Sequence, residues 1–140
     1  MSAPPLSAPA LLPPLSCFIV EDSPIIRQNL IATLEEMLPV QVVGTADDEQ
    51  TALHWMQSPG AHCDLMIIDI FLKAGTGLEV LRQAGMLRPE SRRVVLTNYA
   101  TPDMRRRCAQ LGADRVFDKS AELEELLAYC ATLAPDAARH

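Results

Sequence analysis

Five polar residues in this 140-residue sequence stand where apolar runs end. Glu21 and Asp22 follow CFIV, Asp69 follows CDLMII, Thr97 closes RVVLT, and Lys119 comes two residues after ADRVF. Neighbouring carboxylates repel one another unless a cation neutralises them, and an all-oxygen ligand set of high negative charge suits Mg²⁺. A hydroxyl and an ammonium beside that cation suit the oxygens of a phosphoryl group, which a carboxylate can accept covalently. The set therefore predicts a metal-assisted aspartyl-phosphate site.

Each of these residues also has an ordinary structural interpretation when it is considered alone. Asp22 can cap a following helix, Thr97 is a common strand residue, and a single Lys119 is usually solvated. Asp69 is harder to explain in this way, because the next predicted helix starts too far along the chain for Asp69 to cap it. The hypothesis of a phosphoryl site depends on the residues lying together.

The elements that must position these residues alternate along the chain. Apolar runs predict strands at 17–20, 40–46, 63–69, 93–97 and 113–117. Apolar residues at helical spacing, with caps and breakers, predict helices at 24–38, 47–57, 78–86, 102–111 and 123–133. This alternation is typical of an α/β fold in which a doubly wound parallel sheet is covered on both faces. Ligands of such sheets bind outside the carboxyl ends of the strands, which is where the five polar residues stand.

Composition excludes several other classes of protein. Hydrophobic residues make up 49% and charged residues 21%, with a formal net charge of −6, so a nucleic-acid surface over the whole domain is not expected. No apolar run approaches the length of a membrane-spanning helix. The four cysteines and three histidines have neither disulfide nor zinc spacing, which favours a reduced, cytoplasmic protein. Residues 1–15 contain five prolines and no basic residue, and we expect a disordered tail there rather than a signal peptide.

Four motifs in order resemble the response-regulator receiver domains of two-component signalling. They are FIVEDSP, MIIDIFLKAGTGLEVL, VVLTNYA and LGADRVFDKS, and the resemblance covers about residues 16–133. It implies a flavodoxin-like three-layer sandwich with a five-stranded parallel sheet in the order 2-1-3-4-5. We accordingly expect a receiver domain at 16–134, between tails at 1–15 and 135–140.

The resemblance also implies a role for each site residue. Asp69 would accept a phosphoryl group from a phosphohistidine of a sensor histidine kinase or a histidine phosphotransfer protein. Asp22, Asp69 and the backbone carbonyl of Phe71 would ligate Mg²⁺, and Glu21 would reach the metal through water. Thr97 would donate a hydrogen bond to one phosphoryl oxygen, and Lys119 would pair with another. Such a protein is not an enzyme acting on other molecules, since it promotes only its own phosphorylation and dephosphorylation.

The expected output of the domain is contact with another protein. No sequence follows Arg139-His140 for an output domain, so we expect a stand-alone receiver without direct DNA binding or membrane insertion. The face formed by the fourth helix, fifth strand and fifth helix would contact an unknown downstream protein or a second copy. The alternative is a pseudo-receiver that binds proteins and is never phosphorylated. A haloacid-dehalogenase-type phosphatase is excluded because Asp69 lacks its Asp-x-Asp partner, and a flavodoxin because Glu21 and Asp22 would repel its phosphate.

Three positions depart from the pattern of the family. Lys73 replaces a common loop proline, Val116 replaces the usual switch aromatic, and Ser120 replaces the proline after the lysine. Phe117 should face the other side of its strand from Val116 and is therefore no simple substitute. A cis bond before a non-proline residue costs about 2.5–4 kcal/mol, so we expect either a trans bond with a displaced lysine or a strained bond. Ser120 is also expected to cap the last helix.

Aromatic and basic residues near the site suggest three further hypotheses. Tyr99 would report the phosphorylation state in place of the missing aromatic. Phe71 and Tyr99 would shield the acyl phosphate, which predicts slow self-hydrolysis, although both rings could simply pack locally. The run Arg105–Arg107 would be either a solvated face or a docking surface for an acidic partner.

Overall fold

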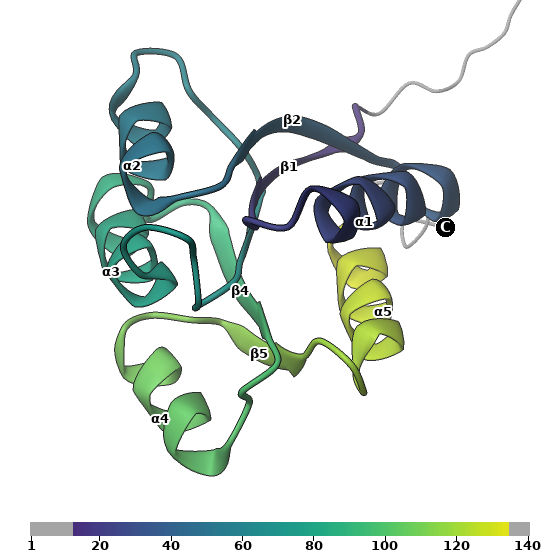
Figure 1. The fold of residues 1–140 in the computed structure, drawn as a ribbon. Helices are drawn as coiled ribbons and strands as arrows, with labels where there is room; N and C mark the ends of the chain where they lie inside the picture. Colours follow the sequence, from purple (N-terminus) through teal and green to yellow (C-terminus); the bar gives the residue numbers. More distant parts are fainter. Residues whose placement is uncertain (1–12, 135–140) are drawn as a thin grey trace, which may run out of the picture.

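The computed structural model describes residues 13–134, which form a five-stranded sheet between two layers of helices. The strand order is β2-β1-β3-β4-β5 and every pairing is parallel. Helices α1 and α5 cover one face of the sheet, and α2, α3 and α4 cover the other (Figure 1). The predicted doubly wound, flavodoxin-like sandwich is confirmed.

Strands and helices alternate without exception along these residues. The strands are β1 Leu15–Val20, β2 Val40–Ala46, β3 Leu65–Ile68, β4 Arg92–Thr97 and β5 Arg115–Asp118. The helices are α1 Pro24–Met37, α2 Glu49–Gln57, α3 Gly77–Leu87, α4 Pro102–Gln110 and α5 Leu123–Leu133.

The inner strands carry apolar side chains on both faces, because both faces are covered by helices. In β3, Leu65 and Ile67 pack with α1 and α5, whereas Met66 and Ile68 pack with the helices on the other face. This alternation gives two apolar clusters with the sheet between them. The sheet is thereby covered on both faces, and its carboxyl edge carries the polar residues.

One boundary of the sequence interpretation needs correction. Leu15, which was assigned to the tail, is the first residue of β1 and is only 6% exposed, because it packs in the cluster beneath α1 and α5. Apart from residues 13–15, the two expected tails lie outside the described residues. Within residues 13–134, no helix has both the length and the hydropathy that crossing a bilayer requires.

Candidate functional site

A lysine ammonium joins the ends of three strands at the carboxyl edge of the sheet. Lys119 follows β5, and its Nζ lies 2.9 Å from Oδ2 of Asp69 after β3 and 2.8 Å from Oε1 of Glu21 after β1. Glu21 is 3% exposed and Asp69 6% exposed. Buried charges are tolerated where they are paired and hydrogen-bonded, as they are here. The structure therefore brings together three of the residues that the sequence placed at strand ends.

Asp22 completes an acidic cluster in the same place. Glu21, Asp22 and Asp69 each offer one carboxylate oxygen, and these three oxygens lie within 4.8 Å of one another. Two like charges 4 Å apart repel by about 4 kcal/mol at an effective dielectric constant of 20. One ammonium cannot neutralise three carboxylates. The surplus negative charge and the all-oxygen donor set fit a hard divalent cation such as Mg²⁺.

The charge state of Lys119 follows from these contacts. Burial by itself lowers the pKa of the ammonium, but hydrogen bonds and charge attraction from Asp69 and Glu21 outweigh burial and raise the pKa above its ordinary value. Lys119 therefore carries a positive charge throughout the physiological pH range. It is a fixed positive charge between two buried carboxylates.

The turn from β1 into α1 holds Glu21 in place. Its Oε2 accepts a hydrogen bond from the backbone N–H of Ser23, and its carbonyl accepts one from the Arg27 guanidinium at 2.7 Å. The Ser23 hydroxyl in turn accepts from the N–H of Ile26 and caps α1. The cap is thus Ser23 and not Asp22, which makes no side-chain hydrogen bond within the part of the chain that the structure describes. The hydrogen bond from Arg27 to the carbonyl of Glu21 was not predicted. No local sequence pattern indicates that an arginine in a helix will reach a carbonyl six residues earlier.

The loop after Asp69 is closed tightly behind the carboxylate. A Cβ atom on Gly77 would lie 1.8 Å from the carbonyl oxygen of Asp69, so only glycine allows α3 to start there. The N–H of Gly77 donates to the carbonyl of Ile70, and Phe71 forms an isolated bridge with Thr76. The N–H of Ile70 donates to Oδ1 of Asp69 at 2.7 Å. The phosphoacceptor candidate is therefore oriented by its own loop as well as by Lys119.

A small open pocket of about 210 Å³ lies over these groups. Its lining residues are Glu21, Asp22, Ser23, Ile26, Asp69, Phe71, Asn98, Tyr99 and Lys119. The rings of Phe71 and Tyr99 meet edge to face at a centroid distance of 4.6 Å, and each is more than half exposed. The two rings form one rim of the pocket, as expected of residues that flank the site. Asn98 and Ile26 were not predicted there, and only the adjacency of Asn98 to Thr97 could have indicated its position.

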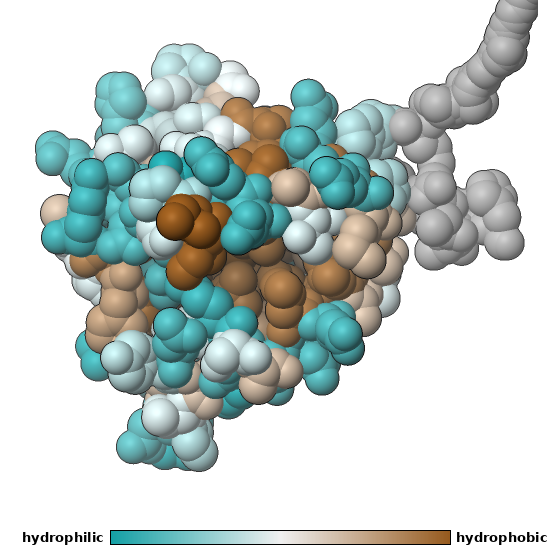
Figure 2. Space-filling model, turned by 45° about the vertical axis from the view of Figure 1, so that its right-hand side comes forward, coloured by the Kyte–Doolittle hydropathy of each residue, from teal (hydrophilic) through white to brown (hydrophobic). Residues whose placement is uncertain are grey.

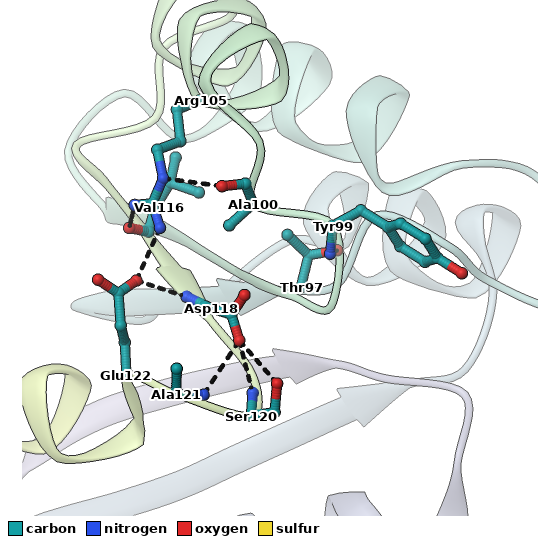
Figure 3. Close-up of polar contacts among 9 residues, drawn as sticks. All are labelled: Thr97, Tyr99, Ala100, Arg105, Val116, Asp118, Ser120, Ala121 and Glu122. Atoms are coloured by element: carbon teal, nitrogen blue, oxygen red, sulfur yellow. Dashed lines mark hydrogen bonds and ion pairs between the residues drawn. The ribbon is translucent and has the colours of Figure 1, made fainter.

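Thr97 ends β4 as predicted, but its side chain is withdrawn from the pocket. The residue is fully buried and is absent from the pocket lining, and its Oγ1 accepts a hydrogen bond of 3.3 Å from the N–H of Tyr99. Figure 3 shows the Tyr99 ring pointing away from Arg105 and Val116. The hydroxyl and the carboxylates thus share the edge of the sheet, and no hydrogen bond joins them within residues 13–134.

Ser120 does not act as the sequence suggested. Its hydroxyl and N–H both donate to Oδ1 of Asp118, which also accepts from the N–H of Ala121 (Figure 3). This turn delays α5, whose N-cap residue is Glu122, and the prediction that Ser120 caps the helix is wrong. Among the described residues no peptide bond is cis, so the bond before Ser120 is trans. The flexible stem of Lys119 nevertheless brings Nζ to both carboxylates.

The two residues at the place of the missing aromatic face opposite sides of β5, as predicted. Val116 packs on the side of α2, α3 and α4, whereas Phe117 is buried with α1 and α5 and lies 6.1 Å from the ring of Tyr129. Phe117 therefore cannot stand in for an aromatic residue at position 116 unless the strand is turned over.

Comparisons with a family model, with curated proteins and with solved structures were made for this chain, and the family model identifies its family. The family model of the response regulator receiver domain matches residues 17–131. The Fimbriae Z protein of Salmonella typhimurium is 26% identical over 113 residues, which cover 81% of this chain and 53% of that protein. A putative transcriptional regulator of Pseudomonas aeruginosa is 34% identical over 109 residues, covering 78% of this chain and 51% of the relative. The chain thus spans about half the length of these curated relatives.

A solved structure shares the fold. It is a response regulator from Burkholderia pseudomallei with a phosphorylated aspartic acid, a calcium ion and citrate, and it is 24% identical with a TM-score of 0.70. The match covers 81% of this chain and 65% of that one.

Proposed function

This chain belongs to the response regulator receiver domain family, and we propose that Asp69 accepts a phosphoryl group from a phosphohistidine of a sensor histidine kinase or a histidine phosphotransfer protein. The observation that carries this proposal is the Lys119 ammonium between two buried carboxylates, with a third carboxylate beside them. Together with a divalent cation held by the acidic cluster, such an arrangement would offset the charge of an incoming dianion and leave one carboxylate as the nucleophile.

In the transfer, one carboxylate oxygen of Asp69 attacks the phosphorus atom and forms a P–O bond. The P–N bond to the imidazole breaks, and its electron pair returns to the ring nitrogen. Lys119 offers its ammonium to the phosphoryl oxygens, which replace part of its contact with Asp69. Thr97 would donate its hydroxyl hydrogen to another of these oxygens.

Asp22, Asp69 and the carbonyl of Phe71 are the proposed ligands of a Mg²⁺ ion, and Glu21 would contact the ion through water. The bound metal would neutralise charge on the phosphoryl oxygens. Because both oxygens of Glu21 already accept hydrogen bonds, a water-mediated role suits this residue better than direct ligation.

The surroundings of the site suit docking of a protein that carries the phosphohistidine. Ile25 and Ile26 on α1 and Leu123 on α5 are exposed, and Ile26 also lines the pocket. A second pocket of about 300 Å³ between α1 and α5 is mostly apolar, and it shares Ile26 and Lys119 with the first. Figure 2 shows brown side chains gathered around a hollow on this face. Exposed apolar patches of this kind indicate interaction surfaces.

We further propose that the output is a protein contact, or a dimer, through the α4–β5–α5 face, within a domain that spans 16–134 together with Leu15. The proposed compartment is the cytoplasm. DNA binding is not proposed for these residues, and the chain would act stoichiometrically rather than as an enzyme on other substrates.

The proposal predicts a metal-dependent phosphorylation at Asp69. The protein is incubated with a small phosphodonor such as acetyl phosphate, with and without Mg²⁺, and its intact mass is measured. The wild type should gain one phosphoryl mass only with the metal, and Asp69→Asn should gain none. Asp47→Asn is the matched control, because Asp47 lies outside the pocket in an exposed pair with Lys73. A wild type that stays unmodified would favour the pseudo-receiver alternative.

The aromatic rim predicts a long-lived phosphorylated form. Phe71→Ala and Tyr99→Ala should each accelerate loss of the phosphoryl group several-fold, because each removes a ring that keeps water from the acyl phosphate. The decay is followed by intact mass after removal of the donor, with Tyr129→Phe as a control at a distant ring. Unchanged decay in both alanine variants would mean that the rings only pack against each other. Tyr99→Ala also tests whether Tyr99 reports phosphorylation, in which case partner binding should change.

A further inference from the structure

Arg105 connects three segments around the end of β5. Its Nε donates to the carbonyl of Ala100 at 3.0 Å, one terminal nitrogen donates to the carbonyl of Val116 at 2.8 Å, and the other donates to Oε1 of Glu122 at 2.8 Å (Figure 3). The three acceptors belong to the loop before α4, to β5 and to the N-cap of α5. A planar guanidinium can span three acceptors in this way, whereas a lysine ammonium on a flexible stem is a single point of charge.

The other two members of the arginine run do not share this arrangement. Arg106 pairs with Asp103 on the solvent side of α4, and Arg107 is exposed. The run is therefore not one uniform docking surface, because Arg105 is turned inward. Arg106 is therefore a suitable control position for Arg105, because it is the neighbouring arginine and its ion-pair partner Asp103 lies in the same helix.

Glu122 strengthens the connection of Arg105 to α5. The same Oε1 atom accepts the N–H of Asp118, so one carboxylate oxygen ties Arg105 to the end of β5. The hydrogen bond from Arg105, followed by that from Asp118, lowers the pKa of Glu122. Glu122 thus stays ionised and paired with Arg105 across the physiological pH range.

The contact with Ala100 links this network to the phosphoryl site. Ala100 lies three residues after Thr97, and the intervening Asn98 and Tyr99 line the pocket. The Thr97 side chain is buried and is not among the residues that line the pocket. A displacement of Thr97 toward a phosphoryl group on Asp69 would carry residues 98–100 with it, because they follow it directly in the chain. Any such shift pulls on the carbonyl that Arg105 holds.

We propose that Arg105 is a positioning residue that holds the 97–101 segment and the start of α5 in the arrangement without a phosphoryl group, and so couples occupation of Asp69 to the α4–β5–α5 face. This inference rests on the proposed function. Because coupling between two sites is reciprocal, removing the Arg105 contacts should make occupation of the site easier while weakening its effect on the distant face.

The test uses beryllofluoride with Mg²⁺ as a phosphoryl analogue on the full chain. Its affinity is measured for the wild type, Arg105→Ala, Arg105→Lys and Arg106→Ala, and backbone amide shifts at 116–122 report the response of β5 and α5. Arg105→Ala and Arg105→Lys should bind the analogue about three- to tenfold more tightly than the wild type. Binding should also change the amide chemical shifts of residues 116–122 less than it does in the wild type. Arg106→Ala should match the wild type in both measurements.

Glu122→Gln leaves Arg105 in place and weakens only one of the three contacts of Arg105. This variant replaces Arg105→Ala in the test if Arg105→Ala does not fold. It should change affinity in the same direction by a smaller factor. The variants could instead melt at a lower temperature while they bind the analogue with wild-type affinity and show wild-type chemical-shift changes. That result would overturn the inference and leave Arg105 a purely structural residue. If the wild type and Arg106→Ala bind no analogue at all, the proposed function fails first and the inference fails with it.

Discussion

Replacing Lys119 with methionine is expected to slow phosphorylation of Asp69 by about 100-fold or more, the usual effect of removing one charge-stabilising donor from a reaction site. Methionine keeps most of the apolar stem and removes the ammonium that contacts Oδ2 of Asp69 and Oε1 of Glu21. The incoming phosphoryl charge would then meet an acidic cluster without its resident cation. The rate is measured by intact mass with a small phosphodonor.

The sequence offers a matched control, because Lys73 is its only other lysine. Lys73 is exposed and pairs with Asp47, so Lys73→Met should phosphorylate at nearly the wild-type rate. Breaking a buried ion pair costs about 3–5 kcal/mol, so Lys119→Met should also melt at a lower temperature, and Mg²⁺ should restore part of that loss. A Lys119→Met protein that is phosphorylated as fast as Lys73→Met would show that the ammonium is not part of the reaction.

Replacing Asp22 with asparagine should stabilise the metal-free protein and, at the same time, abolish its response to Mg²⁺. The side chain of Asp22 has no hydrogen bond in the described residues, and its carboxylate lies within 4.8 Å of two others. Removing that charge relieves a repulsion of about 1–4 kcal/mol per pair, for dielectric constants between bulk water and 20. The melting temperature without metal should therefore rise by several degrees.

The same substitution removes a proposed metal ligand, so phosphorylation should fall by about 100-fold and added Mg²⁺ should no longer raise the melting temperature. Glu36→Gln removes one exposed charge elsewhere on α1 and should leave the metal response intact. The decisive measurement is thermal unfolding with and without Mg²⁺. An Asp22→Asn protein that melts below the wild type in metal-free buffer would contradict the view that these carboxylates repel one another.

Most of the fold could be predicted because its signals are local. Apolar runs, the Ser23 and Thr101 caps and the positive φ of Gly112 at the end of α4 each depend on a few neighbouring residues. The boundary at Leu15 was missed because a single leucine after prolines has no local strand pattern. Ser120 was misassigned as a cap because Asp118, two residues earlier, competes for its N–H and hydroxyl.

The residues that stand at the strand ends can be identified from the amino-acid sequence, because a parallel sheet brings its carboxyl ends to one edge whatever the side chains do. Which of these side chains are in contact depends on the packing of the folded chain. Lys119 reaches Glu21 across 98 residues of sequence, Thr97 lies buried behind the pocket, and Arg105 turns inward while Arg106 does not. These outcomes depend on rotamers and on partners distant in the chain, which no local pattern encodes.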